Sequence, residues 1–379
     1  MTLSSADRLR YSRHLALREI DVAGQEKLSA ARVLVLGAGG LGSPAALYLA
    51  ASGIGTLGIV DCDHVDLSNL QRQVLYDTAN VARPKTAAAR DRLVGLNPGL
   101  NLIAHQVELR AANVREIFSD YDIVLDGTDR FATRFLANDA CVILGKPLVS
   151  AAVHRFEGQA LTYIPGRGPC YRCLFPEPPT DGLIPNCAEA GVLGVLPGVM
   201  GTLQATEAIK IVVGIGEPLL GRLLTYDALE MRFNEFRFAR RSDCAVCGDR
   251  PTITEPRDPP ESCSTEALAA VRRFSARELQ AALNTEASRY TVVDVRDRRE
   301  FAAGHLPGAI HIPVTELAQR LSEIPQDRAI VLVCRSGARS LTACGIAARA
   351  DLQSLAHLEG GLLAWAQEVD PSLIVAAAG

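Results

Sequence analysis

The sequence has no excess of basic residues. Its 39 lysines and arginines are outnumbered by 43 aspartates and glutamates, which gives a formal net charge of −4 and a pI of about 6.0. Proteins that bind nucleic acid normally carry a basic face, so this balance argues against a nucleic-acid partner. The first 32 residues are dense in charged side chains, which excludes a secretory signal peptide there and makes us expect a cytoplasmic protein.

An uninterrupted hydrophobic run is also missing. Residues 33–60 carry no charged side chain, as a membrane span would, but they contain seven glycines and Pro44. These residues divide the segment into strand, turn, helix and strand, whereas a membrane span is one continuous helix. We therefore expect no membrane attachment and interpret the segment as the buried core of a nucleotide-binding fold.

The sequence does contain a regular alternation of apolar strand-like runs and helical stretches. We expect strands over 32–36, at a run that ends at Asp61, and over 122–126 and 147–151, with helices over 41–51, 79–95 and 132–144. Strand-like runs over 158–164 and 222–238 extend the sheet. Such alternation predicts an α/β fold with a doubly wound, Rossmann-like and mostly parallel sheet.

A second domain is predicted beyond a linker. Residues 250–262 hold four prolines and several charges without a hydrophobic period, which is typical of a linker. After it, a helix over 275–284, strands over 290–295 and 329–333, and a helix over 338–349 predict a small α/β domain. We expect a nucleotide-binding domain over 1–250, a linker over 251–272 and the small domain over 273–379.

Residues 37–42 read Gly-Ala-Gly-Gly-Leu-Gly and match a phosphate-binding loop between a strand and a helix. Gly39, Gly40 and Gly42 allow the backbone to approach a phosphate closely, and the helix N-terminus supplies unpaired N–H groups. Asp61 ends the next strand, where a carboxylate can accept hydrogen bonds from ribose hydroxyls. This pattern alone is equally compatible with an NAD-dependent dehydrogenase.

Residues downstream favour a triphosphate. Ser68, Asn69 and Arg72 follow the acidic strand end, and Lys85 follows in an Arg-Pro-Lys motif. Two cations beside a glycine loop suit the charge of a triphosphate, although either cation alone would be interpreted as a solvated surface charge. The motif LDGTD places Asp126 and Asp129 at another strand end, where a carboxylate can hold Mg²⁺ that bridges phosphates.

Five segments follow one another along the chain: RYSRHLALREIDVAGQEKL, GAGGLGSP, DCDHVDLSNLQRQ, RPK and LDGTDRFATR. Together they resemble the MoeB/ThiF branch of the ubiquitin-activating-enzyme superfamily, and the resemblance covers about residues 8–250. It implies that ATP with Mg²⁺ adenylates the C-terminal glycine of a small ubiquitin-like sulfur-carrier protein ending in Gly-Gly, of the MoaD or ThiS kind, with release of pyrophosphate.

The same resemblance assigns roles to single residues. It implies that Asp61 binds the ribose, Arg72 and Lys85 bind the phosphates, and Asp129 binds magnesium. Phosphoryl chemistry needs charge neutralisation more than covalent help, so Arg72, Lys85 and Asp129 are expected to act catalytically in that way. The attacking carboxylate is already ionised and needs no general base.

Two further positions follow from the resemblance. Arg13 matches an arginine that members of the family donate to the ATP site of the neighbouring subunit, which implies a homodimer. The family usually has asparagine after the metal-binding aspartate, whereas this sequence has Arg130. We still place position 130 in the nucleotide site, as a departure from the pattern.

Four of the ten cysteines form two CxxC pairs about seventy residues apart. They are Cys170 and Cys173, and Cys244 and Cys247. Four thiolates suit one tetrahedral Zn²⁺ with no open position, which predicts a structural site. A redox-active CxxC would need only one such pair at the start of a helix.

Cys187 lies in an irregular segment, PPTDGLIPNCAEAG, that is rich in proline and glycine. Loops of this kind carry function more often than packing. In sulfur-transferring relatives the matching cysteine is proposed to attack the acyl-adenylate or to help release the thiocarboxylate. The alternative is a thiol with no role.

Cys334 begins Cys-Arg-Ser-Gly-Ala-Arg-Ser between a strand and a helix. Successive backbone N–H groups, a helix dipole and arginines in such a loop favour the thiolate. Residues 294–313 resemble the second signature of rhodaneses, and this resemblance covers about residues 273–370. A phosphatase of the same fold has five residues between cysteine and arginine; here four separate Cys334 from Arg339, which suits a terminal sulfur, so Cys334 should carry a persulfide.

The fusion of the two domains suggests one reaction sequence. Attack of the Cys334 persulfide on the acyl-adenylate would give an acyl disulfide, and reduction, with Cys187 as the candidate, would release the thiocarboxylate. The sulfur donor would be a cysteine desulfurase or thiosulfate. Molybdenum cofactor, thiamine, cysteine, siderophore and tRNA-thiolation pathways all stay open. The rival interpretation is a non-catalytic scaffold that only recruits the carrier protein.

Overall fold

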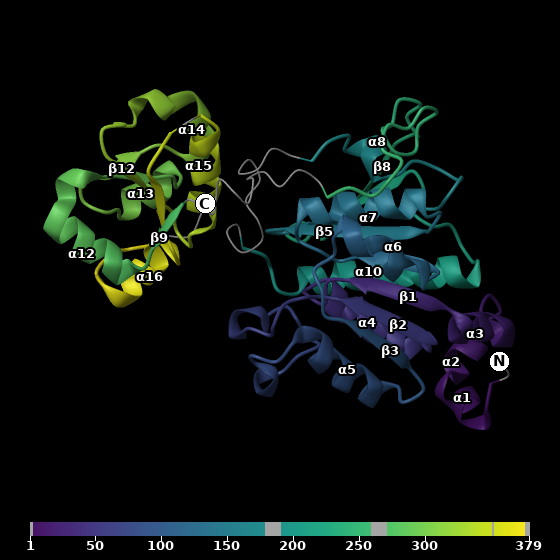
Figure 1. Cartoon of the computed structure of the whole chain (residues 1–379). Coiled ribbons are helices and arrows are strands. Elements are labelled where there is room, and N and C mark those ends of the chain that lie inside the picture. Colours follow the sequence, from purple (N-terminus) through teal and green to yellow (C-terminus); the bar gives the residue numbers. More distant parts are fainter. Residues whose placement is uncertain (1–2, 179–190, 259–270, 351, 376–379) are drawn as a thin grey trace. The chain divides into compact units, whose positions relative to one another are not determined.

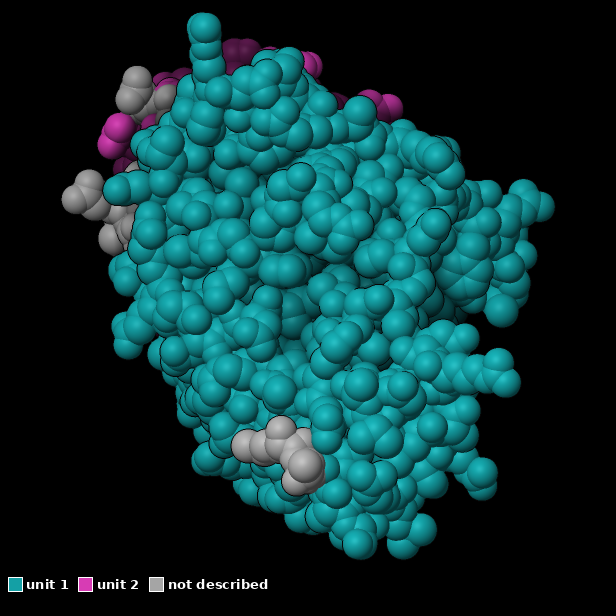
Figure 2. Space-filling model, turned by 90° about the vertical axis from the view of Figure 1, so that its right-hand side faces the viewer, with its two compact units in different colours: residues 1–178, 192–259 teal, residues 179–191, 260–379 magenta. Residues whose placement is uncertain are grey.

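The computed structural model describes residues 3–178, 191–258, 271–350 and 352–375. The chain divides into two compact units, coloured teal and magenta in Figure 2. The first comprises residues 1–178 and 192–259, and the second residues 179–191 and 260–379. Within the described ranges, no helix is both long enough and apolar enough to span a membrane.

The first unit is built on an eight-stranded sheet with the order β3-β2-β1-β4-β5-β6-β7-β8. The strands are β1 (Arg32–Leu36), β2 (Thr56–Val60), β3 (Asn101–His105), β4 (Ile123–Asp126), β5 (Leu148–His154), β6 (Glu157–Tyr163), β7 (Arg222–Asp227) and β8 (Arg232–Arg237). Neighbours from β3 to β5 pair in parallel, and those from β5 to β8 pair antiparallel. The prediction of a doubly wound, mostly parallel sheet is confirmed.

Helices cover both faces of this sheet (Figure 1). They are α1 (Ser5–Arg10), α2 (Ser12–Leu15), α3 (Asp21–Ala30), α4 (Gly42–Ser52), α5 (Lys85–Leu96), α6 (Ala111–Ser119), α7 (Phe131–Ile143), the short α8 (Tyr171–Leu174) and α10 (Leu196–Val213). Val33 and Val35 of β1 pack in one core with α4, α5 and α10, while Leu34 and Leu36 pack in another with α6 and α7. Because both faces are covered, β1 is a continuous apolar run rather than an alternating one.

One predicted helix was misplaced at its start. We expected a helix over 79–95, but residues 78–80 form a 3₁₀ turn and α5 begins only at Lys85. Pro84 precedes the first residue of α5 and has an extended conformation. A proline has no N–H to donate and disfavours a helical conformation of the residue before it, so the helix cannot extend back through this position.

The second unit has a five-stranded parallel sheet with the order β11-β10-β12-β13-β9. Its strands are β9 (Arg272–Phe274), β10 (Tyr290–Asp294), β11 (Ile310–His311), β12 (Ala329–Val333) and β13 (Leu355–Leu358). Its helices are α12 (Ala276–Glu286), α13 (Arg298–Ala303), α14 (Val314–Arg320), α15 (Ala338–Arg349) and α16 (Gly361–Glu368). One face packs against α14 and α15 and the other against α12 and α16, which confirms a second, small α/β domain.

Candidate functional site

The glycine loop joins the end of β1 to the start of α4. Gly37 has a φ of +80°, which only glycine adopts readily. A side chain at Gly42 would place its Cβ 1.8 Å from the Gly37 carbonyl oxygen. The loop therefore closes so tightly that glycine is required at both ends. It leads directly into the N-terminus of α4, where the first N–H groups have no partner within the helix.

Asp61 lies against this loop. Leu36 of β1 pairs in register with Val60 of β2, so the residues that follow the two strands meet at one edge of the sheet. The Ala38 N–H donates to Asp61 Oδ2 at 2.8 Å, and the Asp63 N–H donates to Asp61 Oδ1 at 2.8 Å. Burial raises the pKa of Asp61, and the nearby charge of Lys85 opposes that effect.

Lys85 completes the same cluster. Its side chain is only 6% exposed, and its Nζ lies 2.9 Å from Asp63 Oδ2 and 3.8 Å from Asp61 Oδ2. Partial burial by itself would raise the pKa of Asp63, but the hydrogen bond from Lys85 and the charge of Lys85 outweigh burial and lower it. Asp63 was not singled out from the sequence, although its position two residues after Asp61 was a usable signal.

The segment that carries Ser68, Asn69 and Arg72 folds back beside the glycine loop. A Cβ at Gly40 would lie 3.5 Å from Arg72 Cγ, so the stem of this arginine is next to the loop. Arg72 Nη1 donates to the Ser68 carbonyl oxygen at 3.2 Å, and Asn69 Nδ2 donates to Ser68 Oγ at 3.3 Å. The predicted phosphate-binding residues are thus brought together around one loop.

Of the two aspartates in the LDGTD motif, only one is available to a ligand. Asp126 is fully buried and accepts hydrogen bonds from Arg134 Nε at 3.1 Å, Ser150 Oγ at 2.9 Å and the Thr128 N–H at 3.0 Å. Asp129 is exposed, and its carboxylate has no hydrogen-bond or ion-pair partner among the described residues. The geometry therefore makes Asp126 structural and leaves Asp129 as the candidate metal ligand.

Arg130 forms an ion pair at the surface. Its Nη1 lies 3.1 Å from Glu108 Oε1, and its charge contributes to the lowered pKa of Asp63. The guanidinium is therefore near the Lys85–Asp63 pair, although the side chain is 68% exposed. The structure places position 130 at the rim of the predicted nucleotide site.

Arg13 lies away from this chain's own glycine loop. It is exposed on α2, two residues after Tyr11, whose hydroxyl accepts from Asn97 Nδ2 at 2.9 Å and whose ring packs at Gly53. Gly53 caps the C-terminal end of α4, whereas the glycine loop precedes its N-terminal end. A helix of 11 residues is about 16 Å long. Arg13 therefore lies near the end of α4 that is remote from the glycine loop of its own chain.

The four predicted metal-binding cysteines converge. Their sulfur atoms all lie within 4.8 Å of one another, with 3.6 Å between Cys170 and Cys244 and 3.3 Å between Cys173 and Cys247. Four thiolates at about 2.3 Å from one tetrahedral ion are roughly 3.8 Å apart, so the cluster fits such an ion. Burial raises the pKa of Cys173 to about 11, which a bound cation would reverse by favouring the thiolate.

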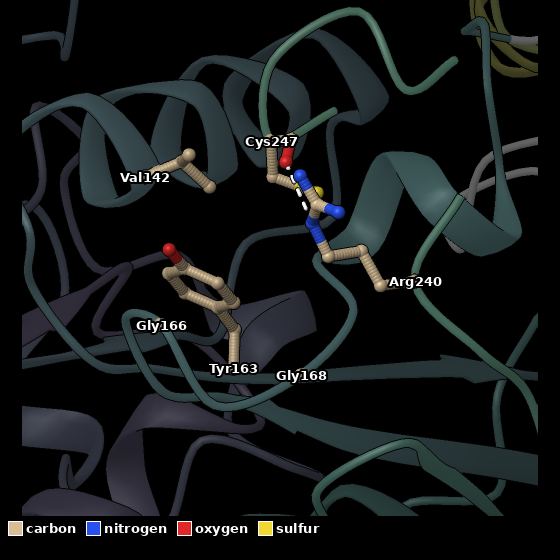
Figure 3. A pocket seen from close by; sticks show the side chains of 6 residues that line it. All are labelled: Val142, Tyr163, Gly166, Gly168, Arg240 and Cys247. Carbon is tan, nitrogen blue, oxygen red and sulfur yellow. Dashed lines mark hydrogen bonds between the residues drawn. The ribbon is translucent and has the colours of Figure 1, made fainter. Parts of the chain in front are cut away.

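A cavity of about 440 Å³ lies beside this cluster. Figure 3 shows its lining residues, with Cys247 on one side and Tyr163 facing into the space. Arg240 Nε donates to the Cys247 carbonyl oxygen at 2.9 Å, which holds the guanidinium over this end of the cluster. None of the predicted nucleotide-binding residues lines the cavity, and of the four clustered cysteines Cys247 does.

In the second unit, Cys334 follows β12 and its sulfur lies in a cradle of donors. The residue is fully buried, and Sγ accepts from the Gly337 N–H at 3.1 Å and the Ser340 N–H at 3.3 Å. Ser340 Oγ lies 3.6 Å from the same sulfur. The six residues from Cys334 to Arg339 thus form the tight loop that the sequence predicted, with a sulfur atom at its centre.

The loop is braced by an ion pair. Arg339 Nη1 and Nη2 lie 2.6 and 2.8 Å from the two carboxylate oxygens of Glu300, which is itself fully buried on α13. A bidentate arginine–carboxylate pair fixes the guanidinium in one orientation. Glu300 was not predicted from the sequence, although it lies inside the rhodanese-like segment 294–313. Cys187, the remaining predicted site residue, lies outside the described residues.

Comparisons with known proteins match this arrangement. The model of the ThiF family matches residues 11–246, and that of the rhodanese-like domain matches residues 275–368. MoeZ of Mycobacterium tuberculosis, named an adenylyltransferase/sulfurtransferase, is 44% identical over 384 residues that cover 98% of this chain and 96% of MoeZ. MOCS3 of Sus scrofa, named an adenylyltransferase and sulfurtransferase, is 42% identical over 403 residues, covering 97% and 87% of the two chains. Among solved structures, Escherichia coli MccB with AMPCPP and MccA is 26% identical with a TM-score of 0.57, covering 63% of this chain and 74% of that chain.

Proposed function

The chain belongs to the ThiF family and carries a rhodanese-like domain after the ThiF part, and we propose that it activates and then sulfurates the C-terminal glycine of a ubiquitin-like sulfur-carrier protein. The observation that carries the first half is the convergence of Asp61, Arg72 and Lys85 on one glycine loop. A buried lysine and a nearby arginine suit a triphosphate, and the dehydrogenase alternative gives no account of them.

In the adenylation step, the carrier carboxylate attacks the α-phosphorus of ATP and pyrophosphate leaves. Asp61 would accept hydrogen bonds from the ribose, while Arg72 and Lys85 would neutralise the phosphates. Asp129 would hold magnesium, which supplies further charge neutralisation when bound. Lys85 has three N–H donors and gives one to Asp63 Oδ2, so another can go to a phosphate oxygen, although the negative charge of Asp63 beside the ammonium group opposes the approach of the phosphates.

We propose that the enzyme acts as a homodimer. Arg13 lies near the C-terminal end of α4, so it does not approach the glycine loop of its own chain. A partner subunit that presents its own arginine at position 13 to this loop would add a third cation at the phosphates. Sedimentation should give a dimer, and mixing Arg13→Ala with Asp129→Ala chains should restore one working site per mixed dimer.

We assign zinc to the four-cysteine cluster. All four ligands are cysteines, the sulfurs form a compact group and three of the four residues are buried, which together favour a closed, structural zinc site. The ion would join the segment around α8 to the segment after β8. It would stabilise the first unit and would take no direct part in adenylation.

We propose that Cys334 carries the sulfur. Its thiolate would attack the outer sulfur of thiosulfate, releasing sulfite and leaving a persulfide; a cysteine desulfurase would supply the same sulfur by persulfide exchange. The persulfide would then displace AMP from the carrier adenylate and form an acyl disulfide. Attack of the Cys187 thiolate on Cys334 Sγ would release the thiocarboxylate and leave a Cys187–Cys334 disulfide for a dithiol reductant.

Carrier-dependent exchange of pyrophosphate into ATP tests the adenylation half. The full chain with a MoaD-type carrier should catalyse exchange, and the same carrier without its terminal Gly-Gly should not. A chain that binds the carrier but supports no exchange would be the non-catalytic scaffold instead. Mass spectrometry of the carrier after addition of thiosulfate then tests the sulfur-transfer half.

A further inference from the structure

A buried histidine lies behind the Cys334 loop and has no role in the reaction described above. His357 is on β13 and is 5% exposed. Side chains alternate along a strand, so His357 shares a face with Leu355, which packs with Ala343 of α15. Its Nδ1 lies 3.4 Å from Ser340 Oγ, whereas its Nε2 is buried without a hydrogen-bond partner among the described residues.

The surroundings of the imidazole favour its neutral form. Burial lowers the pKa of His357, and the charge of Arg273 on the neighbouring strand lowers it further, while Glu359 acts in the opposite direction. A neutral imidazole has one N–H. A buried unpaired N–H is rarer in proteins than a buried unpaired acceptor, so the proton belongs on Nδ1, where Ser340 Oγ can accept it.

Ser340 has a choice of acceptors for its single hydroxyl proton. Its Oγ lies 2.9 Å from the Gly337 carbonyl oxygen and 3.6 Å from Cys334 Sγ, and both of these groups can accept. A Cys334 thiol can donate to Ser340 Oγ, but once Cys334 is ionised its sulfur only accepts, and His357 is then the donor to this hydroxyl among the described residues. A hydrogen bond to an ionised group is about twice as strong as one between neutral groups, so donation to a thiolate is favoured over donation to the carbonyl.

We propose that His357 is a positioning residue for Cys334, because its Nδ1–H, donated to Ser340 Oγ, polarises the Ser340 hydroxyl and strengthens the hydrogen bond that this hydroxyl donates to the Cys334 thiolate. This inference rests on the proposed function in one respect, namely that Cys334 is the thiol that carries sulfur. The sulfur then has three donors: the Gly337 N–H, the Ser340 N–H and the Ser340 O–H. Without His357, the hydroxyl loses this polarisation and becomes a weaker donor to the thiolate.

The test is the pH dependence of the reaction of Cys334 with iodoacetamide in the full-length chain, followed by mass spectrometry of the peptide that contains it. Leucine at position 357 keeps most of the volume and removes the donor, whereas asparagine places an amide N–H close to the position of Nδ1. We expect His357→Leu to move the midpoint of the pH–rate profile upward by about one pH unit, so that alkylation below the midpoint is roughly tenfold slower. His357→Asn should restore most of the wild-type profile.

A double-mutant comparison shows whether His357 acts through Ser340. Ser340→Ala should shift the midpoint in the same direction, and adding His357→Leu to it should cause no further shift. The nearby Arg335, Arg339 and Glu300 charges, and Arg273 and Glu359 beside the imidazole, are the same in all variants.

Several outcomes would overturn the inference. They are an unchanged midpoint in His357→Leu, equal shifts in the leucine and asparagine variants, or additive shifts in the double variant. If His357→Leu does not fold, an unchanged midpoint in Ser340→Ala overturns it as well. The proposed function has its own control: a Cys334→Ala chain that still transfers sulfur from thiosulfate to cyanide would refute the role of Cys334, while the alkylation profiles stay readable.

Discussion

The pair formed by Lys85 and Asp63 gives a prediction about ATP affinity. In the structure without nucleotide, Lys85 Nζ donates to Asp63 Oδ2 at 2.9 Å. If Lys85 binds the triphosphate, the negative charge of Asp63 beside its ammonium group opposes the binding of the phosphates. Asp63→Asn keeps the size of the side chain and removes its charge, so the variant should bind ATP more tightly than the wild type.

The expected gain is small, for a reason visible in the structure. The Asp63 side chain is 62% exposed, and solvent screens such pairs to about 0–1 kcal/mol. ATP would therefore bind at most roughly fivefold more tightly in Asp63→Asn. Lys85→Gln is the comparison variant, because it removes the positive charge instead of the negative one. Loss of one preorganised donor to the charge that develops in the transition state slows catalysis by roughly 10²–10³-fold.

Calorimetric titration with a non-hydrolysable ATP analogue and Mg²⁺ measures both variants, and pyrophosphate exchange gives the rate. The thermal stability of Asp63→Asn should stay close to that of the wild type, because so exposed a pair contributes little. If Asp63→Asn instead bound the analogue tenfold more weakly, Asp63 would be part of the nucleotide or metal site. The idea that the charge of Asp63 opposes ATP binding at Lys85 would then be wrong.

Four other predictions concern the remaining groups. Asp129→Ala should abolish carrier-dependent pyrophosphate exchange and leave thiosulfate:cyanide sulfurtransfer intact; near-normal exchange would mean that magnesium is held elsewhere. Metal analysis should give about one zinc per chain, and Cys170→Ser should lose it and lower the melting temperature by about 10 °C or more; active protein free of zinc would contradict this assignment. Cys334→Ala should still form the carrier adenylate. Mass spectrometry should not show the gain of about sixteen mass units on the carrier that marks the change from oxygen to sulfur. Thiocarboxylate made at the wild-type rate by this variant would show that sulfur bypasses this domain. Cys187→Ala should leave both half-reactions intact and slow only their coupling.

The sequence predicted the central strands well and the peripheral elements poorly. The run at 32–36 is β1 and the stretch at 338–349 is α15, with the predicted bounds in both cases. Both elements lie in the core, where burial leaves a continuous or strongly periodic apolar pattern. Strand β3 lies at the edge of the sheet with exposed positions, and its mixed pattern gave no signal.

Helix α10 was not predicted for a different reason. It has 18 residues, begins Leu-Pro-Gly and has buried residues, including Gln204 and Glu207, on several sides. A helix that is enclosed on most of its surface shows no 3.6-residue period, so pattern reasoning does not detect it. Its buried polar groups are explained only by the fold: Gln204 donates to the carbonyl oxygens of Asp126 and Val149, and Glu207 accepts from Thr162.

The sequence also indicated which segments would meet, but not which side chains would be available. The carboxyl ends of β1, β2 and β4 share one edge because the strands pair in parallel register, and this much follows from the alternating pattern. Whether Asp126 or Asp129 faces a ligand depends on Arg134 and Ser150, which reach Asp126 from α7 and β5. Such contacts arise from packing between distant segments and leave no mark in the local sequence.

Arg130 shows how a departure from a family pattern can be accommodated at such a site. An added arginine beside Asp129 would compete with a metal ion if its guanidinium turned toward that carboxylate. Instead it pairs with Glu108 at 3.1 Å and acts on Asp63. Asp61 and Asp63 place two carboxylates beside Lys85 here. If ATP binds as proposed, Arg130 would reduce the negative charge that the triphosphate meets without occupying Asp129.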